Sequence, residues 1–175
     1  MDDMLLQVEP IIPALRRYAR GLLGDVEASD DIVQDCLERV VANWSRRRDD
    51  NARSWVFAIL HNLAVNRLRQ KARRGNMVPL EDMPEASGAS EATQEQTVYG
   101  NEVMSAIELL PPDHRSILLL ISVEDLSYAE AANVLGVPVG TVMSRLSRAR
   151  EQLRVLLESS PTGIRVGGSH LRRVK

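Results

Sequence analysis

The sequence contains few aromatic residues and a single cysteine. Aromatic residues make up 3% of its 175 residues, so we expect hydrophobic cores built mainly from Leu, Ile, Val and Ala. Cys36, the lone cysteine, excludes an internal disulfide and favours a reducing compartment. It falls on the apolar face of an expected helix, which predicts a buried structural thiol and not a nucleophile.

Long hydrophobic runs are also absent. No window of about 18 consecutive apolar residues exists, so we expect no transmembrane helix. The acidic start "MDDMLLQVEP" lacks the basic segment and cleavage site of a secretory signal. Together these features predict a cytoplasmic protein with no membrane insertion.

Patterns that carry catalysis are missing as well. The three histidines, His61, His114 and His170, are far apart and show no metal-ligand spacing. The chain has no glycine-rich phosphate loop, Walker pattern or nucleophile elbow. We therefore expect no enzyme activity, no catalytic residue, no metal, no cofactor and no small-molecule substrate.

The charge of the chain is unevenly distributed, although the net charge is only −2. Residues 1–75 carry 13 basic and 11 acidic side chains, and residues 114–175 carry 9 and 5. The segment 76–113 between them has 8 acidic side chains and no basic one. Two mildly basic segments are thus joined by a purely acidic one, a pattern that the net charge conceals.

Apolar residues recur with a helical period along most of the chain, which predicts an all-α fold with no strand. The expected helices cover about 4–22, 26–45, 53–74, 98–110, 113–124, 127–135 and 139–158. Asp25 and Asp113 are expected N-caps, and Ser127 with Glu130 forms a capping box.

Two segments without periodicity divide this helical pattern. Residues 76–97 mix Gly, Pro, Ser and acidic residues and predict a flexible linker, and residues 160–175 predict a disordered basic tail. The expected architecture is therefore two small helical domains, 1–75 and 98–159, joined by a flexible acidic linker.

The stretch "GVPVGTVMSRLSRAREQL" follows the capped helix 127–135 and completes a helix-turn-helix pattern. In such a unit the second helix presents its N-terminal residues to base edges in the major groove. Thr141, Ser144, Arg145 and Arg148 share one helical face, opposite an apolar stripe. Solvated arginines on a helix surface are the alternative, but the cap, turn and polar face together favour DNA contact.

Helix 26–45 has an acidic face made by Asp31, Gln34, Asp35 and Glu38. This face lies opposite the apolar stripe of the helix and is suited to a basic helical partner. Taken alone, a solvated surface is the simpler interpretation. DNA is not a candidate partner, because carboxylates repel phosphates.

Helix 53–74 ends in a strongly basic segment. Asn62, Asn66, Arg69 and Arg73 line one side of the helix, and further charge comes from Arg67, Lys71 and Arg74. Such a surface neutralises phosphates, and the asparagine amides are suited to reading an unstacked base. From composition alone, a solvated helix end is an equal alternative.

Taken together, these segments resemble the extracytoplasmic-function (ECF, group IV) sigma factors of bacterial RNA polymerase. The resemblance is carried by "SDDIVQDCLERVVANW", "SWVFAILHNLAVNRLRQKARR", "LLPPDHRSILLL" and "DLSYAEAANVLGVPVGTVMSRLSRAREQL". The last block is the most specific. The resemblance covers about residues 5–74 and 98–158.

This resemblance implies that the N-terminal domain is sigma region 2. The stripe Asp31, Gln34, Asp35 and Glu38 would bind the coiled coil of the polymerase β′ subunit. The loop 45–53 and the following helix would open the −10 element, with Asn62 holding a flipped base. The implied −10 surface comprises Asn62, Asn66, Arg67, Arg69, Arg73 and Arg74.

The C-terminal domain would be sigma region 4, which reads the −35 element and contacts the β flap. The implied −35 surface comprises Thr141, Met143, Ser144, Arg145, Ser147 and Arg148. The acidic linker would thread the RNA path of the polymerase, and an anti-sigma factor is an expected partner.

Two departures from the family affect specificity. Met143 stands where many relatives carry Arg or Lys, and no aromatic lies between Trp44 and Trp55, where relatives often have phenylalanine. We expect both tryptophans to be core residues. Two alternative functions remain: a sigma mimic that titrates an anti-sigma factor, and a stand-alone helix-turn-helix repressor.

Overall fold

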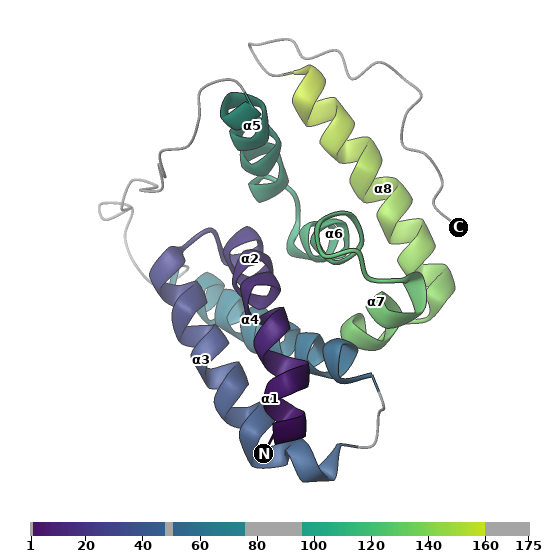
Figure 1. Ribbon diagram of the computed structural model, residues 1–175. Helices are drawn as coiled ribbons and strands as arrows, with labels where there is room; N and C mark the ends of the chain where they lie inside the picture. Colours follow the sequence, from purple (N-terminus) through teal and green to yellow (C-terminus); the bar gives the residue numbers. More distant parts are fainter. Residues whose placement is uncertain (1, 48–50, 76–95, 160–175) are drawn as a thin grey trace.

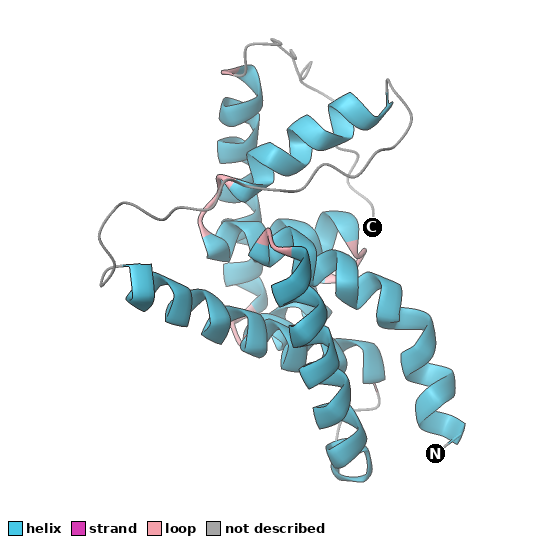
Figure 2. Cartoon of the chain, turned by 90° about the vertical axis from the view of Figure 1, so that its left-hand side faces the viewer, coloured by secondary structure: helices cyan, strands magenta, loops and turns pink. Residues whose placement is uncertain are grey.

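The protein is described by a computed structural model that covers residues 2–47, 51–75 and 96–159. These segments consist of helices joined by short turns, with no strand among them (Figure 2). The all-α expectation is confirmed. Within the same segments, no helix is both long and apolar enough to cross a membrane.

The N-terminal half contains four α-helices and two short 3₁₀ turns. They are α1 (Asp2–Val8), η1 (Glu9–Ile11), α2 (Ile12–Leu23), α3 (Val26–Asn43), η2 (Trp44–Arg46) and α4 (Ala52–Gly75). The expected helix 4–22 is divided in two, because Pro10 lies in η1 and Pro13 in the first turn of α2. Asp25 caps α3 as expected, since its side chain accepts a hydrogen bond from the Ala28 amide at 2.9 Å.

The C-terminal half also contains four α-helices. They are α5 (Gln96–Glu108), α6 (Pro112–Leu118), α7 (Tyr128–Leu135) and α8 (Val139–Glu158), with a π-helical turn, η3 (Leu119–Val123), after α6. The linker boundary at residue 97 is corrected, because α5 begins at Gln96. The Asp113 cap was wrong: α6 follows Pro111, so Asp113 lies inside its first turn.

Helices α7 and α8 form the expected helix-turn-helix. Ser127 and Glu130 make both hydrogen bonds of the capping box at the start of α7. Gly136 ends α7 with a φ of 65°, a left-handed conformation that glycine adopts without strain. The buried stripe of α8 consists of Val142, Leu146, Ala149 and Leu157.

The two halves pack against each other and share one continuous hydrophobic core (Figure 1). Helix α2 contacts both α6 and η3, and α4 contacts α7. The sequence predicted two domains but left their arrangement open. Most of the expected linker, 76–95, and the expected tail, 160–175, lie outside the described residues.

Candidate nucleic-acid and protein interfaces

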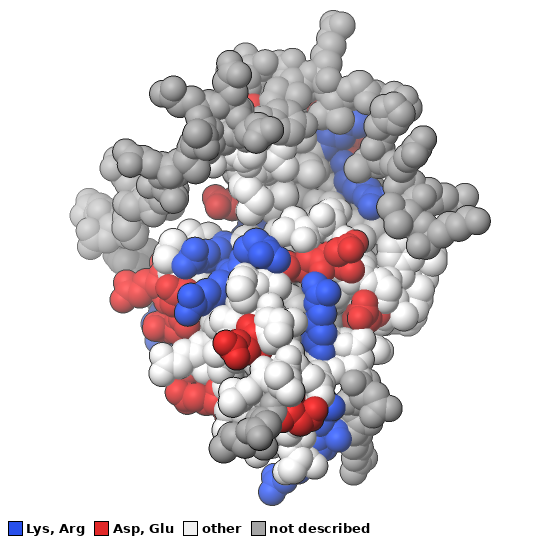
Figure 3. Space-filling view, viewed as in Figure 1, with Lys and Arg blue, Asp and Glu red and all other residues white. Residues whose placement is uncertain are grey.

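Helix α3 divides sharply into a buried and an exposed face. Ile32, Val33, Cys36 and Val40 are buried against the neighbouring helices. The four residues of the acidic stripe are all exposed: Asp31, Gln34, Asp35 and Glu38. Acidic side chains gather over α3 at the left edge of the molecule (Figure 3).

Cys36 is a structural thiol, as its position in the sequence predicted. It is fully buried, and its Sγ lies 3.6 Å from the carbonyl oxygen of Val56 in α4. Burial raises the pKa of the thiol to about 12, despite the opposing charge of Arg39. The thiol therefore stays protonated and unreactive at neutral pH.

The basic end of α4 is exposed over its last three turns. The exposed side chains include the whole −10 set: Asn62, Asn66, Arg67, Arg69, Arg73 and Arg74. Near this end a cleft of about 240 Å³ is lined by cationic side chains such as Arg67, Lys71 and Arg74, and by the α2–α3 turn. Several cations around an open cleft suit the phosphates of a nucleic-acid strand.

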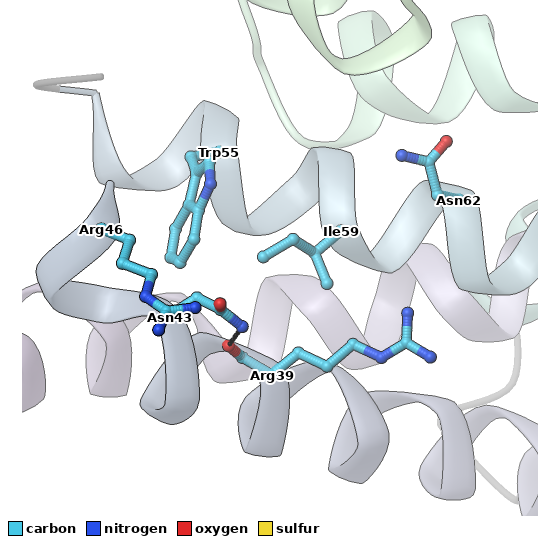
Figure 4. A pocket seen from close by; sticks show the side chains of 6 residues that line it. All are labelled: Arg39, Asn43, Arg46, Trp55, Ile59 and Asn62. Atoms are coloured by element: carbon cyan, nitrogen blue, oxygen red, sulfur yellow. Dashed lines mark hydrogen bonds between the residues drawn. The ribbon is translucent and has the colours of Figure 1, made fainter. Parts of the chain in front are cut away.

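Asn62 lies on the rim of an open hollow of about 370 Å³ between α3 and α4 (Figure 4). Ile59 and Trp55, which also line the hollow, lie on the two preceding turns of α4. The other wall comes from Arg39, Asn43 and Arg46. The Asn43 side chain is fixed by a hydrogen bond of 2.9 Å to the carbonyl oxygen of Arg39. The hollow thus combines an apolar floor with amide and guanidinium groups.

Arg39 and Asn43 of α3 were absent from the sequence-based candidates, whereas Arg46 falls in the loop 45–53 that the family resemblance assigned to the −10 element. Arg39 and Asn43 are spaced at i and i+4, a pattern shared by many solvated helix faces. Only the crossing of α3 and α4 brings them opposite Asn62. Nothing in their local sequence separates them from other exposed polar residues.

Trp44 and Trp55 form an edge-to-face pair beside the hollow, with ring centroids 6.1 Å apart. Both pack against the core but remain half-buried, and the guanidinium of Arg47 lies 4.1 Å from the Trp44 ring centroid. The expectation of core residues is therefore only partly right, because Trp55 also lines the hollow.

Helix α8 presents its polar face away from the core. Met143, Ser144, Ser147 and Arg148 are exposed, whereas Thr141 and Arg145 are half-buried. One guanidinium nitrogen of Arg145 lies 3.9 Å from a carboxylate oxygen of Asp113 in α6. This distance is long for an ion pair, so Asp113 holds the arginine only weakly.

No group of three or more metal-ligating side chains occurs within residues 2–47, 51–75 and 96–159. Three candidate surfaces remain: the acidic face of α3, the basic end of α4 with its adjacent hollow, and the arginine-bearing polar face of α8.

Comparison with known proteins gives separate matches for the N-terminal and C-terminal halves of the chain. Residues 100–153 match the family model described as Sigma-70, region 4, and residues 8–61 match the Sigma2 domain of PhyR. The ECF RNA polymerase sigma factor EcfG of Rhodopseudomonas palustris is 34% identical over 163 residues, covering 89% of this chain and 83% of that protein. The chain belongs to the ECF sigma factors.

Two solved structures share the fold of this chain. The Bartonella quintana sigma factor RpoE, in complex with the anti-sigma factor NepR, superposes with a TM-score of 0.78 at 28% identity. The match covers 91% of this chain and 99% of that one. CnrH, in complex with the cytosolic domain of CnrY, gives a TM-score of 0.67 at 26% identity, covering 90% and 88% of the two chains.

Proposed function

We propose that this sigma factor binds RNA polymerase core and directs promoter-specific initiation by reading −35 and −10 elements. Residues 1–75 act as region 2, 76–95 as the linker and 96–159 as region 4. The observation that carries the proposal is the recognition helix α8, whose polar face points outward on an ECF sigma factor fold. The polymerase performs the chemistry of RNA synthesis.

The acidic stripe of α3 is the surface that docks on the β′ coiled coil. Three exposed carboxylates, those of Asp31, Asp35 and Glu38, provide charge for basic side chains of a helical partner. Region 4 contacts the β flap.

The hollow beside Asn62 holds one flipped base of the −10 element. Extracting a base costs a few kcal/mol of stacking and pairing. Trp55 and Ile59 offer an apolar wall for the base, the Asn62 amide can bond its edge, and the guanidinium groups of Arg39 and Arg46 lie where phosphates can approach. Beyond this hollow, Asn66, Arg67, Arg69, Arg73 and Arg74 follow the strand along α4.

Region 4 reads the −35 element through α8. Arg145 and Arg148 provide the base or phosphate contacts, with Thr141, Ser144 and Ser147 beside them. The exposed Met143 offers an apolar contact, for example to a thymine methyl group, in place of a charged one.

An anti-sigma factor is the expected regulator, since the related Bartonella quintana sigma factor is found in complex with NepR. We place the protein in the cytoplasm with the polymerase. A second candidate function is a sigma mimic, which is favoured by the match of residues 8–61 to the Sigma2 domain of PhyR, an anti-anti-sigma factor. The match to EcfG covers 89% of this chain and 83% of that protein, and this coverage of both chains favours the sigma factor.

Run-off transcription tests the proposal. Purified protein is added to polymerase core on the DNA upstream of its own gene, with core alone and protein alone as controls. A discrete transcript that requires both components is the expected result. Failure to bind core in the same samples would contradict the proposal and favour the mimic.

A further inference from the structure

The basic end of α4 carries its polar side chains on two different faces. Successive residues of an α-helix are about 100° apart, so four of these residues share one face within about 60°: Asn62, Asn66, Arg69 and Arg73. A second group is centred about 120° further round the helix and lines the cleft of about 240 Å³: Arg67, Gln70, Lys71 and Arg74. The cleft is therefore a separate surface, although it shares Arg67 and Arg74 with the proposed −10 set.

The opposite wall of the cleft comes from the turn that joins α2 to α3 (Figure 1). Gly24 ends α2 with a φ of 68°, a left-handed conformation that lets the chain reverse directly into α3. This reversal brings Asp25 and Ala28, in the cap and first turn of α3, to the cleft. Leu23 and Leu68 add an apolar part to the lining. Two elements that are distant in the sequence thus border the same cleft.

The cations of the cleft have no acidic partner in the part of the chain that the structure describes. Within residues 2–47, 51–75 and 96–159, no carboxylate forms an ion pair with Arg67, Lys71 or Arg74. The carboxylate of Asp25 also lines the cleft, but it caps α3 by accepting a hydrogen bond of 2.9 Å from the Ala28 amide. Three cations and one carboxylate give the described lining residues a net charge of +2.

The first turn of α3 adds to this positive potential. The N-terminus of an 18-residue helix carries N–H groups without helical partners and the positive end of the helix dipole. Such a terminus is a common element of anion sites, and here it stands across the cleft from the cations of α4. The amide of Gln70 provides a further hydrogen-bond donor.

The charge and the volume of the cleft indicate the class of ligand. Its volume is smaller than the about 300–1,000 Å³ of pockets that take drug-sized molecules. A terminal phosphate carries a charge of about −1.5 to −2 and three acceptor oxygens, whereas each phosphate within a DNA strand carries one charge. A net charge of +2 in a small cleft therefore matches a free dianionic phosphate compound better than it matches a DNA strand.

We propose that the cleft between the basic end of α4 and the α2–α3 turn binds a small phosphate compound, such as pyrophosphate or the terminal phosphates of a nucleotide. Arg67, Lys71 and Arg74 bind the phosphate oxygens, and the first turn of α3 and the Gln70 amide donate further hydrogen bonds. Because the proposed function assigns Arg67 and Arg74 to the −10 element, a bound ligand lowers the affinity for promoter DNA. This coupling rests on the proposed function, whereas binding of the ligand does not.

Isothermal titration calorimetry of the full-length protein with pyrophosphate, in magnesium-free buffer at fixed salt concentration, tests the site. Arg74→Ala and Lys71→Ala should each weaken binding by about tenfold, because each removes a charge-assisted hydrogen bond. Arg73→Ala is the matched control, since Arg73 is the neighbour of Arg74, is also exposed and lies on the other face of α4. Alanine is the best helix former, so none of these variants weakens α4. A parallel titration with ADP shows whether the cleft prefers the free diphosphate or the nucleotide.

A heteronuclear NMR titration of the same protein locates the ligand. Pyrophosphate should shift the backbone amide signals of residues 25–28 and the side-chain amide signal of Gln70. The side-chain amide signals of Asn62 and Asn66, on the other face, should not move. Three results would overturn the site: no binding of pyrophosphate or ADP, equal weakening by Arg73→Ala and Arg74→Ala, or shifts concentrated at Asn62 and Asn66.

Binding of a labelled −10 fork DNA to the holoenzyme, again without magnesium, tests the coupling. Saturating pyrophosphate should lower the affinity of the wild type for this DNA by at least about fivefold, and should affect Lys71→Ala less. Equal effects on both proteins would overturn the coupling. If the holoenzyme does not form or does not bind the DNA at all, the proposed function fails, while calorimetry and NMR still decide the site.

Discussion

The hydroxyl of Tyr18 in α2 lies 2.8 Å from Nδ1 of His61 in α4. The Tyr18 ring packs edge-to-face against Phe57 and beside the His61 ring, and Tyr18 is fully buried. Burial lowers the pKa of His61 to about 4, and the charge of Asp113 only partly opposes this. The imidazole is therefore neutral in the folded protein at neutral pH, and burial raises the pKa of the tyrosine so that it stays a neutral phenol.

This pair makes stability depend on pH. An unfolded histidine binds its proton at about pH 6.5, whereas folded His61 does so only near pH 4. Acidification between these values favours the unfolded chain, and the loss of unfolding free energy is about 2 kcal/mol at pH 5. Urea unfolding at pH 7 and at pH 5 measures this loss of unfolding free energy.

The variant His61→Gln is the control, because an amide can still accept the bond from Tyr18 without binding a proton. Its stability should change less between the two pH values than that of the wild type. Equal changes in both proteins would assign the pH dependence to other groups.

The recognition helix gives a second prediction. Arg145→Ala and Arg148→Ala should each lower transcription from promoters that depend on the −35 element by about tenfold, since a bidentate base contact is worth about 1–3 kcal/mol. Run-off transcription at a fixed salt concentration measures the effect. Arg154→Ala, which removes an arginine paired within α8, is the control. Loss of core binding in either of the first two variants would argue against the region 4 assignment.

The acidic stripe gives a third prediction. Asp31→Lys combined with Asp35→Lys should weaken binding to polymerase core at least about tenfold, because like charges would face the basic partner. The double variant Asp3→Lys with Glu9→Lys changes the net charge equally on the exposed surface of α1 and η1. Fluorescence anisotropy with labelled protein compares the affinities of the two double variants for polymerase core. Equal affinities would remove the α3 stripe from the polymerase interface.

The hollow gives a fourth prediction. Asn62→Ala and Arg39→Ala should both weaken opening of the −10 element, but only the first should change the preferred base, because an arginine at a phosphate carries no sequence information. Permanganate footprinting on promoters with each base at the flipped position measures both effects. Arg154→Ala, in α8 and outside both the hollow and the basic end of α4, is the control. If Asn62→Ala left base preference unchanged, the hollow would not be the reading pocket.

Local sequence determined much of this protein. The 3.6-residue apolar period placed the helices, Asp25 and the Ser127–Glu130 pair marked two helix starts, and the specific block around Arg145 and Arg148 led to the family. These features depend on residues within a few positions of one another, so a single sequence is enough to read them. The one misplaced cap, Asp113, failed because Pro111 and Pro112 start α6 earlier than the side-chain signal suggested.

Contacts between distant segments could not be read in this way. Arg39 and Asn62 share a hollow only because α3 crosses α4, and Glu124 meets Arg17 across 107 residues of chain. The charge pattern suggested two separate domains, since an acidic segment divides the basic ones. The tertiary structure joined them, because a buried carboxylate and a closely packed Gly21 obtain their partners only when α2 and η3 meet.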